Sequence, residues 1–252
     1  MKRTIVAICI VGALFAALGD AAAPRRGRPK GLSKPSGGIV EKAYRGKTIR
    51  VVNVTKAVEQ DLLNSIALRI RRSAQLPIDV EAGAIPDGES AMAYARAAAK
   101  ADGIGATVVV VDDKGLPIIM SSPDEKWAIL NVASFKRDKL EDRMLKSLWG
   151  AVARAVGAGS TGDAGCVLVP FGSVQQLDAI AAAEPSPVAH NALIDTAKMS
   201  GINMIFFATY RTACQQGWAP QPTNDVQRTI WNEIHAIPDR PITIEFDPKR
   251  DK

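Results

Sequence analysis

The sequence has few of the residues from which metal sites are built. Its 252 residues include two histidines and three cysteines, and one of the cysteines, Cys9, lies inside an apolar N-terminal run. The other four residues are Cys166, His190, Cys214 and His235, and their spacing matches no short zinc motif. One tetrahedral site built from these scattered positions is conceivable, but the sequence does not predict it.

Long apolar segments are also missing. No segment approaches the roughly 20 apolar residues that a transmembrane helix needs. The run at residues 5–18 is shorter, follows Lys2 and Arg3, and is itself followed by small residues at 21–23. This order predicts a Sec signal peptide at residues 1–23, cleaved near Ala23, and therefore a periplasmic or secreted protein with no membrane span after cleavage. A retained N-terminal anchor is the alternative.

Export bears on the two cysteines that remain after cleavage. An even pair of cysteines in an oxidising compartment suggests a disulfide between Cys166 and Cys214. Two separate buried thiols are the alternative, and the sequence leaves both open.

An excess of positive charge is missing from the main part of the chain. The formal net charge is +6, but seven basic residues and one acidic residue lie within the first 34 positions. From residue 35 onward, 25 basic residues balance 25 acidic ones, so nucleic acid is not an expected partner. Pro, Gly and Ser accompany the N-terminal basic residues. We therefore expect a flexible basic linker at residues 24–46 and one globular domain at residues 47–252.

The glycine-rich stretch near the middle of the chain does not predict a phosphate-binding loop. Gly157, Gly159 and Gly162 spell G-x-G-x-x-G, but a dinucleotide loop needs a strand before it and a helix after it. Here an amphipathic helix precedes Gly157 and an apolar, strand-like run follows Gly165. Gly157 is therefore interpreted as the residue that ends the helix in a left-handed conformation. No P-loop or G-x-S-x-G motif occurs, and we expect no cofactor.

Apolar periodicity predicts alternating strands and helices. Strands are expected at residues 47–54, 76–83, 106–112, 116–122, 126–135, 202–210 and 241–246. Helices are expected at 55–75 with Thr55 as N-cap, at 89–100, 138–156, 174–183 and 189–199, and from Thr223 onward. The turn at 112–115 predicts that the strands on either side of it form a hairpin. The interleaved order predicts an α/β or α+β fold with a single mixed β-sheet packed with helices.

Three positions after the expected helix end share a spacing with a known motif. Gly157 is followed by Cys166 and then by Leu168, and this pattern is similar to the signature of the archaemetzincin family of zinc metallopeptidases. That signature is His-Glu-x-x-His-x-x-Gly-x-x-x-Cys, then four residues, then Cys-x-Met. Laid on this sequence without a gap, its glycine, second cysteine and methionine fall on these three positions. The resemblance covers residues 47–168 and implies a metzincin, zincin-like fold.

The residues that carry the chemistry of that family are replaced here. The resemblance places the two helical zinc-binding histidines on Gly150 and Arg154, the general-base glutamate on Ala151, the third ligand region on Ser160 and the first cysteine on Thr161. Two imidazoles four residues apart grip zinc from one helix face, and the carboxylate takes a proton from the bound water. Glycine and alanine offer no donor atom, and arginine stays cationic. We therefore expect no catalytic residue and no metal at these positions.

The leading hypothesis is a catalytically inactive, archaemetzincin-like protein, or pseudo-metallopeptidase, with a binding or structural role. Related folds bind an extended peptide along the edge strand of the sheet, so the resemblance implies a peptide or protein partner at an edge-strand cleft. Arg154 could hold a carboxylate of such a partner, with an internal salt bridge or plain solvation as alternatives. An active hydrolase with another site, involving His190 and His235, is the alternative function, and an unrelated α/β domain is the third. The segment at 218–246 matches no mechanism.

Overall fold

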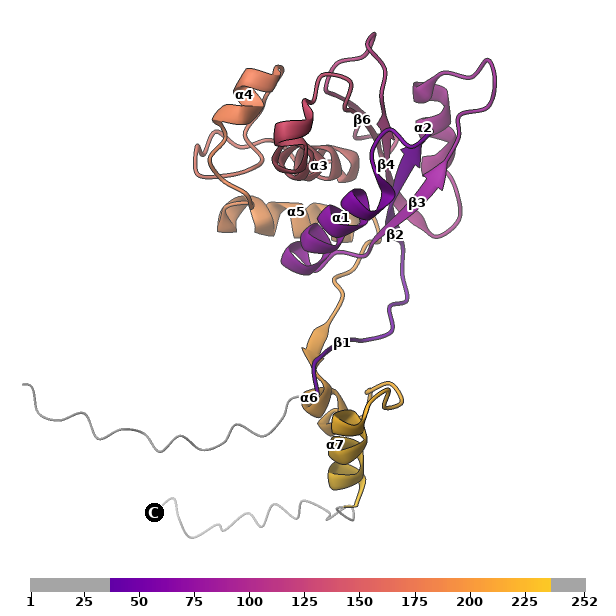
Figure 1. The fold of residues 1–252 in the computed structure, drawn as a ribbon, viewed down its shortest axis with the longest axis vertical. Coiled ribbons are helices and arrows are strands. Elements are labelled where there is room, and N and C mark those ends of the chain that lie inside the picture. The colour runs from indigo at the N-terminus through magenta and orange to yellow at the C-terminus, as the bar shows by residue number, and fades with distance from the viewer. Residues whose placement is uncertain (1–36, 237–252) are drawn as a thin grey trace, which may run out of the picture. The chain divides into compact units, whose positions relative to one another are not determined.

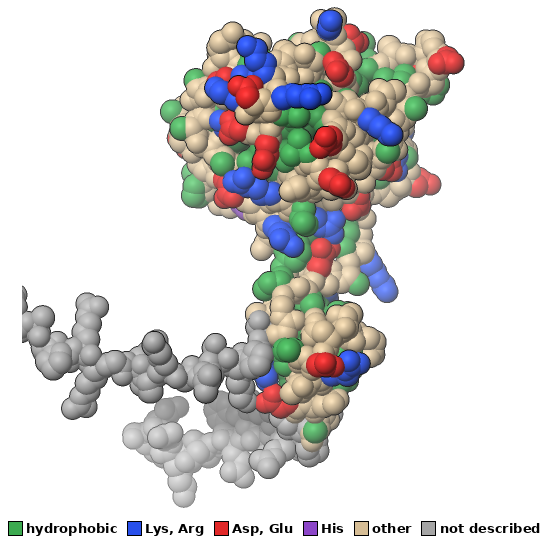
Figure 2. Space-filling view, in the orientation of Figure 1, with side chains coloured by type: hydrophobic (Ala, Val, Ile, Leu, Met, Phe, Trp, Pro, Cys, Tyr) green, Lys and Arg blue, Asp and Glu red, His purple; other side chains and the backbone are tan. Residues whose placement is uncertain are grey.

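The computed structural model describes residues 37–236 (Figure 1). The expected signal peptide at 1–23, most of the expected linker and the expected final strand at 241–246 lie outside these residues. None of the helices within 37–236 has the length and apolar content that crossing a membrane requires. On the face drawn in Figure 2, acidic and basic side chains are interspersed over the described part of the chain, and neither sign forms a broad patch there.

Strands and helices alternate along the first two thirds of the described chain, as the sequence predicts. The strands are β1 (Ile39–Glu41), β2 (Thr48–Val54), β3 (Ile78–Gly83), β4 (Ile104–Val111), β5 (Ile119–Ser122), β6 (Trp127–Asn131) and β7 (Phe207–Thr209). The helices are α1 (Gln60–Ala74), α2 (Ala91–Ala99), α3 (Leu140–Val156), α4 (Val174–Ala179), α5 (Pro187–Met199), α6 (Tyr210–Gln215) and α7 (Asp225–His235), and a short 3-10 turn, η1 (Arg137–Lys139), precedes α3.

A mixed sheet of five strands forms the centre of the fold and confirms the expected fold class. Its order is β3-β2-β4-β6-β5. β3, β2, β4 and β6 are parallel to one another, and β5 pairs antiparallel with β6 at one edge. The side chains of β4 from Gly105 onward are all buried, as are those of β6, because helices cover both faces of the parallel strands.

The hairpin expected between the strands on either side of the 112–115 turn is wrong. β6 lies between β4 and β5, so that β5 forms its hairpin with β6 instead. The physical reason is burial. All five side chains of β6 are buried, and the polar one, Asn131, forms hydrogen bonds inside the protein, which suits a central strand. All four residues of β5 are only half-buried, which suits an edge strand.

The two faces of the sheet are covered unequally. α1, α3 and α5 share the larger apolar cluster with one face, whereas α2 packs on the opposite face over β4 and β6 (Figure 1). α3 is the most buried helix, and its side chains Met144, Leu148, Trp149 and Val152 are at most 1% exposed. Their spacing of three and four residues is the pattern from which the helix was predicted.

The first helix begins later than the sequence suggests. Thr55 was expected to cap it, but Thr55 and Lys56 have positive φ angles of 49° and 57°, which no helix N-cap adopts. The helix begins at Gln60 instead. The side-chain amide of Asn53, buried at the end of β2, donates to the carbonyl of Val58 at 2.9 Å and to the Gln60 side chain at 3.0 Å. These hydrogen bonds fix the loop that the helix prediction had absorbed.

A second, two-stranded sheet is an addition to the single sheet that was expected. β1 pairs antiparallel with β7, and α6 and α7 pack beside it around Tyr210, Cys214 and Ile230. The expected linker at 24–46 is therefore wrong at residues 39–41, which form a strand. At Gly37, which has a φ of 72°, an added Cβ would lie 2.8 Å from Ile230, so the chain is already closely packed there.

The two cysteines are separate buried thiols. Cys166 lies in the large apolar cluster beneath the five-stranded sheet, and Cys214 lies in the cluster around α6 and α7. The Cys166 sulfur accepts a backbone hydrogen bond from Ser186 at 3.2 Å. Burial raises the pKa of the Cys214 thiol. The disulfide between Cys166 and Cys214 is not formed. The structure has the other alternative that the sequence left open, two separate buried thiols.

An ion pair attaches α4 to α3. The guanidinium of Arg143, only 5% exposed, donates two hydrogen bonds to the Asp178 carboxylate, at 2.8 and 2.7 Å. Lys139 adds a third contact to the same carboxylate at 3.2 Å. The hydrogen bonds from Arg143, followed by those from Lys139, hold the pKa of Asp178 well below its ordinary value.

This ion pair gives the fold an acid-sensitive contribution. A carboxylate with a depressed pKa stabilises the native state above its unfolded pKa of about 3.9, and that contribution is lost as the pH falls through the folded value. We expect Asp178→Asn to be less stable than the native protein at pH 7. Below about pH 4, the urea midpoint of the native protein should fall more steeply with pH than the midpoint of Asp178→Asn. Asp124→Asn, at an exposed carboxylate, is the control. Equal acid dependence of native protein and Asp178→Asn would contradict the assignment.

Candidate functional site

Three of the positions that the archaemetzincin resemblance singles out, Gly150, Ala151 and Arg154, lie on the second half of α3. This helix contacts β4, β5 and β6, so its second half lies beneath the antiparallel edge of the sheet. It ends at Gly157, whose φ of 94° is left-handed. The amides of Gly157 and Ala158 both donate to the carbonyl of Ala153, at 3.1 and 2.8 Å. The interpretation of Gly157 as a helix stop is therefore confirmed.

The space in front of Gly150 is filled by apolar side chains. A Cβ added at Gly150 would lie 3.3 Å from Cδ1 of Ile119 on β5 and 3.5 Å from Cε1 of Phe171. Phe171 is 8% exposed and anchors a small apolar cluster with Leu177 and Ile180. Ala151, beside Gly150, is fully buried. The absence of a side chain at Gly150 thus lets β5 and Phe171 close onto the helix.

Arg154 lies half-buried one helical turn beyond Gly150. Its guanidinium carbon is 6.0 Å from the centre of the Phe171 ring, a cation–π distance. Burial lowers the pKa of Arg154, but a guanidinium remains charged at any physiological pH. Within residues 37–236 no acidic side chain forms a salt bridge with it. The internal salt bridge considered for Arg154 is therefore not formed among the described residues.

The residues at this site do not fit a zinc ion. Gly150 and Ala151 present no donor, Arg154 presents a positive charge, and Ser160 is exposed in the loop beyond Gly157. Thr161 lies in the same loop, where its hydroxyl accepts a hydrogen bond from the backbone amide of Asp163 at 3.1 Å. A zinc site needs three or four N, S or carboxylate donors around one point, and this helix supplies none of them.

The alternative site with two histidines is not assembled either. His190 lies on α5, where its Nε2 is buried and makes no hydrogen bond within the described residues. His235 ends α7 and stacks on Trp231 at 4.1 Å. Across residues 37–236 no three His, Cys, Asp or Glu side chains gather as metal binding would require. Trp231 and His235 also belong to the segment at 218–246, whose remaining part from residue 237 is outside the described chain.

The edge strand beside Gly150 has backbone groups that point away from the sheet. The amide of Asn131 donates to the carbonyl of Ile118 at 2.8 Å, so Ile118 directs its backbone toward β6. Backbone direction alternates along an antiparallel pair, which turns the N–H and C=O groups of Ile119 and Ser121 outward. Neither residue has another backbone partner among the described residues. These two residues are the part of β5 to which another strand could be added.

The sequence located the helix positions of this site but missed what faces them. The run at 166–172 was expected to be strand-like, whereas it is an irregular buried loop that delivers Phe171 to the helix. Pro170, which precedes Phe171 in this run, is the sequence signal that argues against a central strand. The position of Ile119 could not be inferred, because it depends on β5 pairing with β6 and not with β4.

Fold and site together define an α/β protein with a mixed sheet and a buried helix, α3, beneath its antiparallel edge strand, in which Gly150, Ala151 and Arg154 supply no zinc ligand. No family model and no curated protein matches the sequence.

The structure is similar to three solved structures. They are a zinc-dependent peptidase from Methanocorpusculum labreanum (12% identity, TM-score 0.47), archaemetzincin from Methanopyrus kandleri (13%, 0.47) and archaemetzincin from Archaeoglobus fulgidus complexed with malonate (15%, 0.44). The match covers 57–60% of this chain and 96–99% of theirs. The likeness concerns the arrangement of sheet and helices; the chemistry depends on the residues that this chain carries.

The close packing at Gly150 leads to a stability prediction. Gly150→His introduces an imidazole that is pushed against Ile119 and Phe171, and overpacking of this kind costs about 1–3 kcal/mol. Gly150→Ala is the control, because its tight Cβ contact is offset by a gain in helix propensity of about 1 kcal/mol, so its stability should stay near that of the native protein. Urea unfolding at pH 7 measures both. A Gly150→His variant as stable as Gly150→Ala would show that the space is open.

Proposed function

We propose that this chain is a metzincin-like binding protein without zinc peptidase activity, and that it binds extended peptide segments along the outer edge of β5. The observation that carries the proposal is the packing at the former metal position. Gly150 and Arg154 replace the donors that zinc needs, and Ile119 and Phe171 fill the space in front of Gly150. A protein that kept hydrolysis would need those donors.

The edge of β5 supports the binding part of the proposal. The outward backbone groups of Ile119 and Ser121 can pair with a strand from a partner, and this mode of recognition needs no metal. β5 is only four residues long, and its side chains are half-buried, so that it offers a short docking edge. A short edge of this kind is less prone to indiscriminate strand pairing than a long, flat one.

Arg154 supports a preference for an acidic residue in the partner. The guanidinium is partly desolvated, lies beside Phe171 and has no salt bridge among the described residues. A desolvated arginine without a carboxylate gains most from one supplied by a ligand, because charge-assisted hydrogen bonds are stronger than neutral ones. The contact with Phe171 keeps the guanidinium on the α3 face of the sheet. Every second side chain of a strand added to β5 would point to this same face.

Metal content and peptidase activity test the inactive part of the proposal. We expect purified protein, supplied with zinc and then dialysed, to retain far less than one zinc per chain and to leave a general peptide substrate library uncleaved. His190→Ala should behave identically. Stoichiometric zinc in the native protein, lost with peptide cleavage in His190→Ala, would overturn the proposal and favour the alternative hydrolase.

A proline at the edge strand tests the binding part. Ser121→Pro removes the outward N–H, a substitution that edge strands tolerate, and the loss of one backbone hydrogen bond should weaken binding about three- to tenfold. Ser121→Ala keeps the N–H and is the matched control. The probe is a fluorescein-labelled peptide of alternating Val and Thr with one central Asp, followed by fluorescence anisotropy.

The same assay tests the role assigned to Arg154. The peptide with Asn in place of its Asp should bind the native protein more weakly, whereas Arg154→Gln should bind the two peptides equally well. If Ser121→Pro and Ser121→Ala bind alike, the peptide does not pair with β5. If Arg154→Gln still distinguishes the two peptides, the carboxylate is recognised elsewhere.

A further inference from the structure

A hollow lies on the other face of the sheet, away from α3. It has a volume of about 840 Å³, and its walls come from the ends of β2 and β4, the loop at 84–90 before α2, and the loop at 112–118 before β5. Its lining includes Met120 and Ile129, which belong to the apolar cluster that α2 forms with this face. The hollow is therefore separate from Gly150 and Phe171, which lie on the α3 face.

The position of the hollow follows from the order of the strands. The chain passes from β2 through α1 to β3 on one side, and then through α2 to β4 on the other side of β2. α1 and α2 accordingly lie on opposite faces. The carboxyl ends of β2 and β4 flank this reversal, at Val54 and Val111. In open sheets with parallel strands, ligands bind outside the carboxyl ends of the strands at such a reversal.

The floor of the hollow is apolar because one helix cannot cover the whole face. α2 has nine residues and packs over β4 and β6, and among residues 37–236 no helix covers the sheet beyond its N-terminus. The half-buried side chains of Met120 and Leu116 form the floor there, next to the fully buried Ile129, and Met92 of α2, 42% exposed, borders it. A hollow with an apolar floor and a few polar groups at its rim has the composition of a small-molecule site.

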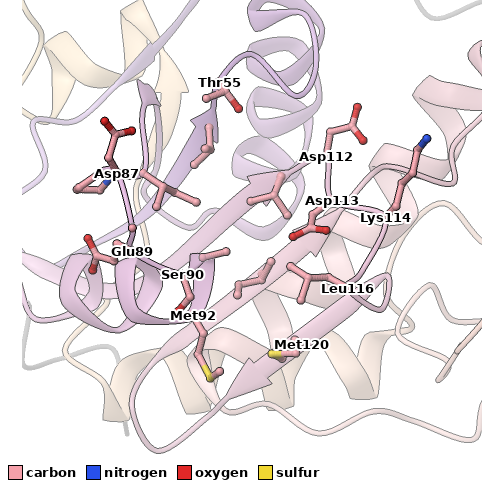
Figure 3. A pocket seen from close by; sticks show the side chains of 17 residues that line it. Thr55, Asp87, Glu89, Ser90, Met92, Asp112, Asp113, Lys114, Leu116 and Met120 are labelled. Atoms are coloured by element: carbon pink, nitrogen blue, oxygen red, sulfur yellow. The ribbon is translucent and has the colours of Figure 1, made fainter.

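The rim carries four carboxylates. Asp87 and Glu89 lie on one side, Asp112 and Asp113 lie opposite, and the amino group of Lys114 points away from the space between them (Figure 3). None of these four carboxylates forms a salt bridge with a basic side chain among the described residues. The rim therefore has a net negative charge, which attracts cations and repels anions.

One wall of the hollow is held in place by a buried amide. The Asn131 side chain donates to the carbonyls of Asp113 and Leu116, both at 2.7 Å, and accepts from the amide of Asp113 at 3.0 Å. Asn131 is 4% exposed, so these hydrogen bonds are shielded from water. The loop that presents Asp112 and Asp113 is thus fixed before any ligand arrives, which lowers the entropic cost of binding.

We propose that this hollow binds a small organic cation with an apolar body, such as an alkylammonium ion. The apolar part lies on the floor formed by Met120 and Leu116, and the ammonium group lies at the rim between Asp87 and Asp112. The proposal is independent of peptide binding at β5, since it uses other residues on the other face of the sheet. It accounts for two features together, an uncovered apolar floor and a rim with uncompensated negative charge.

Hexylammonium is the probe, with 1-hexanol and hexanoate as matched neutral and anionic compounds. Two of the six methionines, Met92 and Met120, line the hollow, so protein labelled with ¹³C at the methionine methyl groups reports binding directly. We expect hexylammonium to shift the Met92 and Met120 signals saturably and to leave Met144, buried in α3, unchanged. The variants Met92→Leu and Met120→Leu assign the signals. Hexanol should bind about tenfold more weakly, and hexanoate should not bind.

Charge-matched variants show whether the rim is responsible. Asp87→Asn with Asp112→Asn removes two charges at the carboxyl ends of the strands and should weaken hexylammonium binding roughly tenfold. The control, Asp102→Asn with Asp124→Asn, removes two charges next to the amino ends of β4 and β6 and should leave the affinity within about twofold of the native value. Native methionine spectra without ligand show that both variants are folded.

Three results would overturn the proposal. The first is no saturable shift at Met92 and Met120, the second is equal affinity for hexylammonium and hexanol, and the third is equal weakening by the rim variant and its control, which would indicate attraction to the overall charge alone. The peptide assay with Ser121→Pro and Ser121→Ala is a separate measurement, and none of these three results changes its outcome. A failure of the cation proposal is therefore distinguishable from a failure of the function proposed for β5.

Discussion

The packing of α3 against the five-stranded sheet is the interaction on which the rest of the structure depends. Leu148, Trp149 and Val152 are buried between the sheet and the neighbouring helices, and α1 and α5 are held on this face through the same cluster. Complete burial of large apolar side chains is the main source of stability in a domain of this size. The same burial limits what the second half of the helix can carry, since all of its residues except Arg154 are buried against the sheet, Phe171 or the neighbouring helices.

The small residues on α3 are explained by this contact. A peptidase of the kind the sequence resembles needs open space in front of the helix for a metal, water and substrate. Here Gly150 has no side chain, and the edge strand and Phe171 close onto it. Gly150 lowers helix propensity by about 1 kcal/mol relative to alanine, a cost that close packing offsets. Arg154 is only half-buried, although Ala153, Ala155 and Val156 around it in the helix are buried, so part of its side chain remains accessible.

The elements that could be predicted from the sequence are those fixed by local pattern. The strong periodicity of α3, its left-handed end at Gly157 and the buried strand β4 are all visible in the order of residues. Strand pairing was less accessible, because the turn after β4 has good hairpin chemistry, and only the complete burial of β6 shows that β6 must take the central place. The two-stranded sheet was missed for the same reason: β1 and β7 have three residues each and pair across more than 160 positions of the chain.

The two faces of the sheet have different coverage, and this difference separates the two sites. Among residues 37–236, three helices cover one face, and there the space in front of Gly150 is filled from within the protein. One helix of nine described residues, α2, covers part of the other face, and there apolar side chains line a hollow at the carboxyl ends of β2 and β4. Because the strand order reverses at β2, α1 and α2 lie on opposite faces of the sheet. α3 and α5 pack on the same face as α1. A ligand-sized space in this chain therefore lies opposite the face that α1, α3 and α5 cover.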